Sequence, residues 1–220
     1  MTKPLDLRCY FVTGRSEDVV QRCAEAAAGG AGIIQVRSKP ISARELYTLA
    51  AEVARAVHTV RPEVPVLIDD RLDVALALRD AGVDIAGVHL GQDDLDVRAA
   101  RRLLGPDAVI GLTTGTLELV QAANKDANVL DYVGCGPFRA TPTKDSGRAL
   151  IGLEGYPELA AASRVPMVAI GDVTVEDAFD LARTGVDGVA IVRGIMHALD
   201  PRAYCQRVVE EFDRGATLKP

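Results

Sequence analysis

Eight short apolar runs recur along the chain, and a segment with helical spacing of apolar and polar residues follows each of them. Most runs are apolar throughout and do not alternate, which is typical of parallel strands buried on both faces. The segment 42–60 repeats apolar residues every three or four positions, and this spacing predicts an amphipathic helix. The eight runs are residues 8–13, 31–37, 65–69, 86–90, 108–113, 132–136, 166–171 and 188–193.

The sequence also marks where several of these helices begin and end. Ser42 with Glu45, and Thr174 with Asp177, have the Ser/Thr-x-x-acid spacing of a capping box. Glycine is expected just after a helix, because it adopts left-handed backbone angles at little steric cost. Glycines in this role are expected at Gly29-Gly30, Gly82 and Gly185.

Strict strand–helix alternation predicts a parallel sheet, either open and doubly wound or closed into a barrel. Eight units in 220 residues give roughly 27 residues a unit, enough for a strand, a helix and short loops. Eight units favour the closed form, so the predicted fold is an α/β, single-domain (β/α)8 TIM barrel with parallel strands. No linker or low-complexity tract divides the chain, and the expected domain spans 1–220.

Composition narrows the classes of partner. The chain has 25 Lys and Arg against 31 Asp and Glu, a net charge of −6, and no Trp. A general nucleic-acid binder needs a basic stripe and often stacking aromatics, so this class is not expected. Phosphorylated small molecules need only a local cluster of cations and stay open as ligands.

Localisation can be judged from the N-terminus, the longest apolar stretches and the cysteines. The first residues, MTKPLDLRCYFVTG, have no apolar core with a cleavage site, and no uncharged stretch approaches a membrane span. The four cysteines form no metal-binding spacing, which favours buried thiols in a reducing compartment. We therefore expect a cytoplasmic protein with no membrane partner.

The active site of a TIM barrel lies at the carboxyl ends of its strands, and polar residues gather there in this chain. Gln35, Arg37 and Lys39 alternate after the second run, so their side chains should point to the same side. Asp70 and Asp94 follow the next two runs and could share one Mg²⁺ ion with substrate phosphate oxygens. The alternative is that each carboxylate caps the helix that follows it.

Later loops add hydroxyl groups and cations. Thr141, Thr143 and Lys144 stand within four residues of each other, a spacing suited to wrapping a diphosphate but also found in a plain surface turn. The loops after the seventh and eighth strands commonly form a phosphate site in these barrels. Gly171 and the pair Arg193-Gly194 lie there, which indicates a second anion site.

With these residues in view, the chain resembles the thiamine phosphate synthase family from Tyr10 to about Ile195. The matching stretches include YFVTG, IIQVRSK, LIDDRLDVALA, GVHLGQDDL and DYVGCGPFRATPTKDSG, of which GQDDL and GPFRATPTK are the most specific. The resemblance implies a transferase that couples hydroxymethylpyrimidine diphosphate to hydroxyethylthiazole phosphate. The implied products are thiamine phosphate and diphosphate, and the implied cofactor is Mg²⁺.

The resemblance also implies roles for individual residues. Arg37, Lys39 and Lys144 would be the catalytic cations, and Asp70 and Asp94 would bind Mg²⁺. No protein nucleophile is required, because positioning and electrostatic stabilisation of the departing charge suffice. The implied substrate-binding residues are Tyr10, Gln35, Arg37, Lys39, Asp69, His89, Thr113, Thr141, Thr143, Lys144, Gly171, Val192, Arg193 and Gly194.

Several positions depart from the family pattern. Asp69 stands where Asn is common, and its charge would repel a diphosphate unless it helps the metal or is paired. Asp172 replaces a glycine and Arg193 a serine, while Ser38 and Thr113 are milder changes. Arg193 could offset Asp172 by pairing with it or by binding the phosphate. Our hypothesis is that Arg193 is the main ligand of the thiazole phosphate.

Two other functions remain as alternatives. A thiazole tautomerase-like isomerase would need an acid–base group, but Gly115 stands where such relatives carry His. A catalytically degenerate barrel that only binds a phosphorylated metabolite would explain Asp69 and Asp172. Barrels of this kind often associate, so a homo-oligomer is an expectation in either case.

Overall fold

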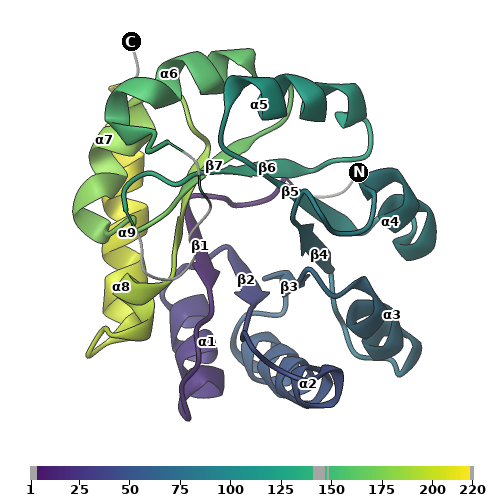
Figure 1. Ribbon diagram of the computed structural model, residues 1–220. Helices are drawn as coiled ribbons and strands as arrows, with labels where there is room; N and C mark the ends of the chain where they lie inside the picture. Colours follow the sequence, from purple (N-terminus) through teal and green to yellow (C-terminus); the bar gives the residue numbers. More distant parts are fainter. Residues whose placement is uncertain (1–3, 141–146, 148, 219–220) are drawn as a thin grey trace.

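The eight apolar runs form eight parallel strands that close into one barrel in the order β1 to β8. This computed structural model describes residues 4–140, 147 and 149–218. Figure 1 shows the strands at the centre and the helices around them, which confirms the predicted TIM barrel. The strands are β1 (Cys9–Val12), β2 (Ile33–Val36), β3 (Val66–Asp69), β4 (Gly87–Leu90), β5 (Val109–Thr114), β6 (Tyr132–Cys135), β7 (Met167–Ile170) and β8 (Gly188–Ile191).

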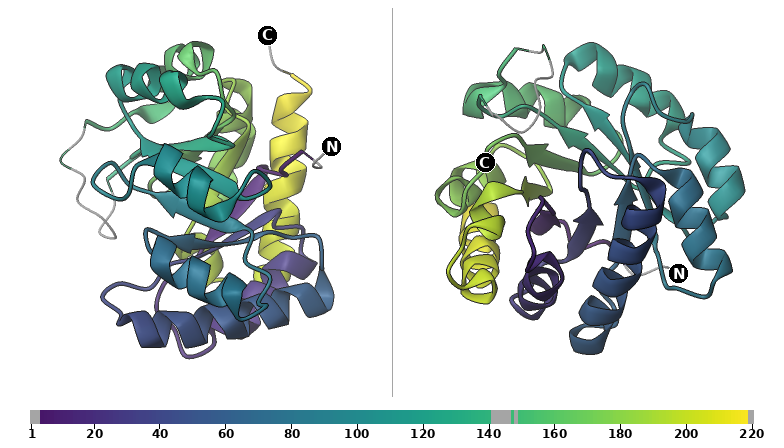
Figure 2. Two further views of the ribbon diagram at one scale, coloured as in Figure 1. Left: turned by 90° about the vertical axis from the view of Figure 1, so that its right-hand side faces the viewer. Right: turned by 60° about the horizontal axis from the view of Figure 1, so that its bottom comes forward.

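Helices follow the strands in turn and form the outer layer, as the two further views in Figure 2 show. The last helix, α9, packs beside α7 and α1 and closes the ring between the end and the start of the chain. Within the described residues the helices are α1 (Val19–Ala28), α2 (Ala43–Val60), α3 (Leu72–Asp80), α4 (Val97–Leu104), α5 (Leu117–Ala123), η1 (Asn124–Asp126), α6 (Gly152–Ala162), η2 (Val175–Asp177), α7 (Ala178–Arg183), α8 (Arg193–Met196) and α9 (Pro201–Ala216).

The helix boundaries follow the signals in the sequence. At the start of α2 the Ser42 hydroxyl accepts a hydrogen bond from Glu45 N, and the Glu45 carboxylate accepts one from Ser42 N. Thr174 and Asp177 form the same reciprocal cap at η2. Gly30 has a φ of 101° just after α1, a conformation that favours glycine.

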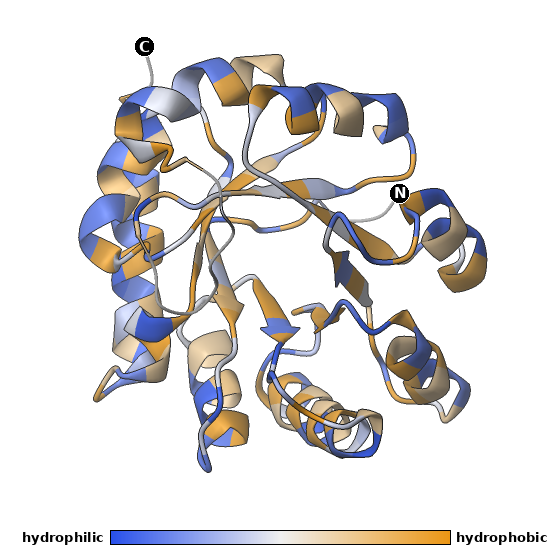
Figure 3. Ribbon diagram, in the orientation of Figure 1, coloured by the Kyte–Doolittle hydropathy of each residue, from blue (hydrophilic) through white to orange (hydrophobic). Residues whose placement is uncertain are grey.

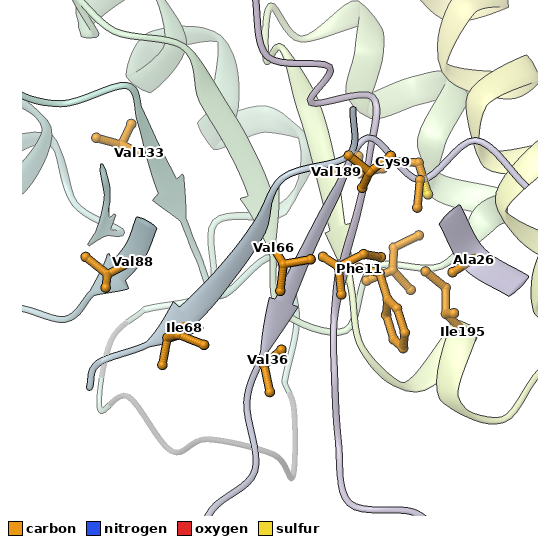
Figure 4. Packing of buried hydrophobic residues seen from close by; sticks show 14 of the residues in the cluster. Cys9, Phe11, Ala26, Val36, Val66, Ile68, Val88, Val133, Val189 and Ile195 are labelled. Atoms are coloured by element: carbon orange, nitrogen blue, oxygen red, sulfur yellow. The ribbon is translucent and has the colours of Figure 1, made fainter. Parts of the chain in front are cut away.

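Each strand sends alternate side chains outward to the helices and inward to the barrel. The outward set forms the larger core, and Figure 4 shows Phe11, Val36 and Val66 among its packed members, with Ala26 from α1. Apolar faces of the helices meet this layer while polar faces point away, as the colours of Figure 3 indicate. The four cysteines belong to this outward core, are buried and form no disulfide.

The inward side chains form a second, smaller cluster inside the barrel. It contains Tyr10, Ile33, Leu67, Tyr132 and Val168. Pairing places Tyr10 beside Ile33 of β2, and Gln35, the next inward residue of β2, beside Leu67 of β3. The barrel therefore ends in a polar mouth at the carboxyl ends of its strands. Among the described residues no helix is long and apolar enough to span a bilayer.

Candidate active site

The carboxyl ends of the strands surround a cavity that reaches into the barrel. Its lining brings together residues that lie far apart in the sequence and that the sequence analysis selected: Tyr10, Gln35, Arg37, Asp69, His89, Thr113, Gly171, Val192 and Arg193. A second, more open cavity is lined by Arg15, Lys39, Asp70, Asp94 and again Arg37. Because Arg37 lines both, the two cavities adjoin at the mouth of the barrel.

The side chains that follow β2 converge on one buried carboxylate, Asp69 at the end of β3. Gln35 Nε2 donates to Asp69 Oδ1 at 2.5 Å. Arg37 Nε and Lys39 Nζ lie 3.4 and 3.2 Å from Asp69 Oδ2. The same-side placement predicted from the alternation is confirmed. Asp69, which stands where the family pattern has Asn, is thus paired with cations, one of the two arrangements that would offset its charge.

Arg37 is also held through its backbone. Thr13, just after β1, accepts a hydrogen bond from Arg37 N at 2.8 Å and donates one to Arg37 O at 2.8 Å. The Arg37 side chain is largely buried, with 19% of its surface exposed. A cation fixed in this way needs little reorganisation when an anion binds.

Lys39 links Asp69 to a second carboxylate, because its ammonium also forms an ion pair with Asp70. Burial alone would lower the pKa of Lys39, but the hydrogen bond to Asp70 and the charges of Asp69 and Asp70 raise it overall. Burial and the neighbouring Asp70 charge raise the pKa of Asp69, which Lys39 and Arg37 only partly offset. The mouth therefore concentrates charge of both signs in a partly desolvated space.

Asp70 and Asp94 lie close enough for their carboxyl groups to share a hydrogen bond. Burial raises the pKa of Asp94, Gly91 N opposes this by donating to Oδ2 at 2.6 Å, and Asp70 raises it further. Asp70 has a φ of 59°, a left-handed conformation in which only a few per cent of non-glycine residues are found. Two carboxyl groups from neighbouring strand ends therefore meet at the mouth of the barrel.

Neither carboxylate caps a helix, which removes the alternative reading of this pair. The N-terminal cap of α4 is Asp96, whose carboxylate accepts from Arg98 N and Ala99 N. The residue at the N-terminal cap of α3 is Arg71, and no side-chain hydrogen bond caps that helix. Asp70 and Asp94 are thus available to other chemistry at the barrel mouth.

A line of hydrogen-bonded side chains crosses the floor of the cavity. Tyr10 OH donates to Gln35 Oε1 at 2.7 Å and lies 2.6 Å from Tyr132 OH. His89 Nδ1 lies 2.8 Å from Tyr132 OH, and His89 Nε2 lies 2.9 Å from Thr113 Oγ1. These bonds join strands β1, β2, β4, β5 and β6.

Tyr132 was not among the residues selected from the sequence. It stands at the first position of β6, inside a run that otherwise signals only a buried strand. No signal in the run marks this residue as facing inward; in the barrel, Gly111 leaves space for its ring. A β carbon at position 111 would collide with the ring of Tyr132, so the glycine makes room for it.

The loops after β7 and β8 meet on the other side of the mouth. Arg193 forms an ion pair with Asp172, and Asp172 has a φ of 58° at a position where the family pattern has glycine. Both side chains are partly exposed, at 44% for Arg193 and 21% for Asp172. Gly194 is packed against α9, because a β carbon there would collide with the Tyr204 hydroxyl.

The predicted site also includes part of a loop. Thr141, Thr143 and Lys144 belong to the loop after β6 and lie outside the described residues. The loop leaves the barrel at Gly136, Pro137 and Phe138, on the same edge as the cavity, and Gly136 and Pro137 line it. The described part of the loop therefore starts at the mouth.

The residues of the barrel mouth lie within a match to a known protein family. The family model of thiamine monophosphate synthase matches residues 9–195, from β1 into α8. The chain belongs to this family. The matched range contains every described residue of the two cavities, and it confirms the family and activity expected from the motifs.

Relatives within the thiamine monophosphate synthase family cover the chain almost completely. The thiamine-phosphate synthase of Corynebacterium jeikeium is 66% identical over 98% of this chain and 99% of its own length. That of Azorhizobium caulinodans is 43% identical over 91% of this chain and 92% of its own length.

Solved structures agree with the fold. The thiamine phosphate pyrophosphorylase of Pyrococcus furiosus has a TM-score of 0.80 and 31% identity, covering 95% of this chain and 96% of that one. The 3-hexulose-6-phosphate synthase of Salmonella typhimurium has a TM-score of 0.65 at 18% identity, which shows a shared barrel alone.

Proposed function

We propose that this member of the thiamine monophosphate synthase family joins hydroxymethylpyrimidine diphosphate to hydroxyethylthiazole phosphate at the described mouth, giving thiamine phosphate and diphosphate. The observation that carries this placement is the convergence of Gln35, Arg37 and Lys39 on Asp69, beside the carboxylate pair Asp70 and Asp94. Cations and closely spaced carboxylates next to a cavity that reaches into the barrel suit a substrate with a ring at one end and a diphosphate at the other.

The pyrimidine end fits the inner cavity. Gln35 can offer an amide donor and an acceptor to a ring, and Tyr10 and His89 stand beside it. The diphosphate fits the open cavity next to Arg37 and Lys39. Thr113, Thr141 and Thr143 would add hydroxyl contacts, and Lys144 would add a third cation from the loop after β6.

Asp70 and Asp94 are the residues that would hold a Mg²⁺ ion. Their carboxyl groups share one small space, where two negative charges repel each other unless a proton or a cation lies between them. Magnesium accepts one or two carboxylates and completes its shell with waters and phosphate oxygens. When bound, Mg²⁺ would supply charge neutralisation on the diphosphate.

Catalysis then follows from where this chain places its charges. Arg37, Lys39 and Lys144 stabilise the negative charge that grows on the diphosphate as its bond to the pyrimidinylmethyl carbon breaks. The thiazole nitrogen attacks that carbon, so the new carbon–nitrogen bond replaces the carbon–oxygen bond. The barrel contributes orientation and electrostatics and forms no covalent intermediate.

The thiazole phosphate is assigned to the opposite edge, at Gly171 and residues 192–194. Here Arg193 supplies the cation, and it must exchange its Asp172 partner for the phosphate. The carboxylate of Asp172 opposes phosphate binding and also keeps Arg193 at the mouth before substrate arrives. A homo-oligomer and a cytoplasmic location stay predictions from the sequence.

One assay tests the proposal. Purified protein is incubated with both substrates and Mg²⁺, and thiamine phosphate is measured after oxidation to its fluorescent product. We expect product that disappears with EDTA and returns with added Mg²⁺. Calorimetry with each substrate separates the alternatives: binding without turnover would indicate a degenerate binder, and product unaffected by EDTA would overturn the metal assignment.

A further inference from the structure

We propose that Asp69 is a positioning residue that sets the direction of the hydrogen bonds across the cavity floor and thereby fixes His89 as the Nδ1–H tautomer. The chain of contacts runs from Asp69 through Gln35, Tyr10 and Tyr132 to His89. What this direction means for the pyrimidine ring rests on the proposed function. The tautomer itself follows from these contacts and the negative charge of Asp69, whatever reaction the mouth catalyses.

The direction begins at Asp69, because an ionised carboxylate accepts hydrogen bonds and cannot donate them. Its Oδ2 lies 3.4 Å from Arg37 Nε and 3.2 Å from Lys39 Nζ, two ion pairs that only the charged carboxylate forms, and its Oδ1 accepts from the Gln35 amide at 2.5 Å. Gln35 must therefore turn its NH₂ group toward Asp69. Its carbonyl oxygen is then left facing Tyr10.

Each later bond follows by counting protons. Tyr10 has one hydroxyl hydrogen and must give it to the Gln35 carbonyl, 2.7 Å away. Tyr132, 2.6 Å from Tyr10, must then donate its own hydrogen to the Tyr10 oxygen. The oxygen of Tyr132 is left to accept from His89 Nδ1 at 2.8 Å. In the neutral ring, Nε2 then carries a lone pair and accepts from Thr113 Oγ1 at 2.9 Å.

The opposite direction is equally compatible with the positions of the heavy atoms. If Gln35 turned over, its NH₂ group would donate to Tyr10, Tyr10 to Tyr132 and Tyr132 to His89 Nδ1. His89 would then carry its hydrogen on Nε2. Nothing between Tyr10 and Thr113 selects between these two states, since hydroxyl groups and a neutral imidazole both donate and accept. The selection comes from the acceptor-only group at the end of the chain.

The residue at position 69 therefore decides whether the hydrogen bonds can run in one direction or in two. Asn, the residue common in the family pattern, can present either its oxygen or its NH₂ group to Gln35 and so permits both directions. Asp permits one. In this chain the NH₂ group and the carbonyl oxygen of Gln35 keep fixed positions. A ring that hydrogen-bonds to both must therefore match that arrangement, because the amide cannot turn over.

The experiment reads the tautomer directly in protein labelled with ¹⁵N-histidine. Long-range ¹H–¹⁵N spectra at about pH 8.5, where a free imidazole is neutral, separate protonated from bare ring nitrogens. His58 provides an internal reference of the opposite kind, because its Nε2 lies 3.1 Å from the Val64 carbonyl oxygen and must carry a hydrogen. A His89→Asn variant identifies the His89 signals.

In the unchanged protein we expect His89 to be at least mostly Nδ1–H while His58 is Nε2–H. In Asp69→Asn we expect the Nδ1–H to Nε2–H ratio of His89 to fall by about tenfold, the difference between a charged and a neutral acceptor. His58 should not change. A His89 ring that is mainly Nε2–H in the unchanged protein would overturn the proposal.

A double-mutant cycle tests whether the effect travels along the chain of contacts. Tyr132→Phe removes the hydroxyl group that links Tyr10 to His89, so adding Asp69→Asn to Tyr132→Phe should leave the His89 signals unchanged. An equal response with and without the Tyr132 hydroxyl would contradict transmission through it. Because the spectra require no turnover, this outcome is independent of the assay of the proposed reaction.

Discussion

The two anion-binding edges of the barrel mouth are built differently. At the β2–β3 edge, Arg37 is 19% exposed, is fixed by Thr13, and lies beside the 8% exposed carboxylate of Asp69. At the β7–β8 edge, Arg193 is 44% exposed and is held by one ion pair with Asp172. The first edge is organised before substrate binds, whereas the second must rearrange. We therefore expect changes at the first edge to affect the chemical step and changes at the second to affect binding.

The largest effect is expected at the organised edge, in Lys39→Ala. Its ammonium contacts Asp70 and Asp69 and faces the cavity assigned to the diphosphate. Removing it should lower kcat/KM by about a hundredfold, equivalent to losing one strong charge-assisted contact. Lys39→Arg should recover part of the loss. Steady-state kinetics at saturating Mg²⁺ measure both, and a loss confined to KM for the thiazole phosphate would contradict the division between the edges.

Lys144→Ala should come next, with a loss of at least about tenfold in kcat/KM, because its proposed contact strengthens as the diphosphate departs. Lys125→Ala is the matched control, an exposed lysine of η1 at the other end of the barrel. Near-normal turnover in Lys144→Ala would mean that the loop after β6 is only a surface turn.

At the second edge, Arg193→Ala should raise KM for the thiazole phosphate about tenfold with little change in kcat, since a lost charged hydrogen bond costs about 1.5 kcal/mol or more. KM for the pyrimidine diphosphate should stay within twofold. Arg183→Ala, at the end of α7 and paired only loosely with Asp180, is the control. An unchanged KM for the thiazole phosphate would contradict the proposal that Arg193 binds this phosphate.

The smallest effect is expected in Asp172→Gly. It removes a carboxylate beside the proposed phosphate site and places glycine at a φ of 58°, a conformation that glycine adopts without steric cost. KM for the thiazole phosphate should fall by about two- to threefold, as expected from removing one screened like charge. A rise in this KM would instead indicate that Asp172 is needed to hold Arg193 in place.

Much of the fold could be predicted because parallel strands buried on both faces leave a simple pattern. The run 132–136, for example, became β6 at Tyr132–Cys135, and the Ser42 cap began α2 as expected. The same-side grouping of Gln35, Arg37 and Lys39 was also predictable, since it depends only on the alternation along one extended segment.

The contacts between strands could not be predicted in the same way. Pairing was one of the options for both Asp69 and Asp172, but the sequence could not select it, because the distances to Lys39 and Arg193 depend on barrel closure and register. Tyr132 was missed because an apolar run does not reveal which of its members faces inward. The capping alternative for Asp70 and Asp94 was settled only when Arg71 was found at the cap of α3 and Asp96 at the cap of α4.

Gly111 carries a consequence for how this barrel can change over evolutionary time. The space that a side chain would take at position 111 is filled by the phenol ring of Tyr132 and the imidazole of His89. A side chain at 111 and a large ring at 132 therefore exclude each other, and neither position can drift alone. In an alignment of relatives the two should vary together, with glycine at 111 wherever an aromatic residue occupies 132. The lack of room for a single β carbon at position 111 would then be visible as covariation between the two positions.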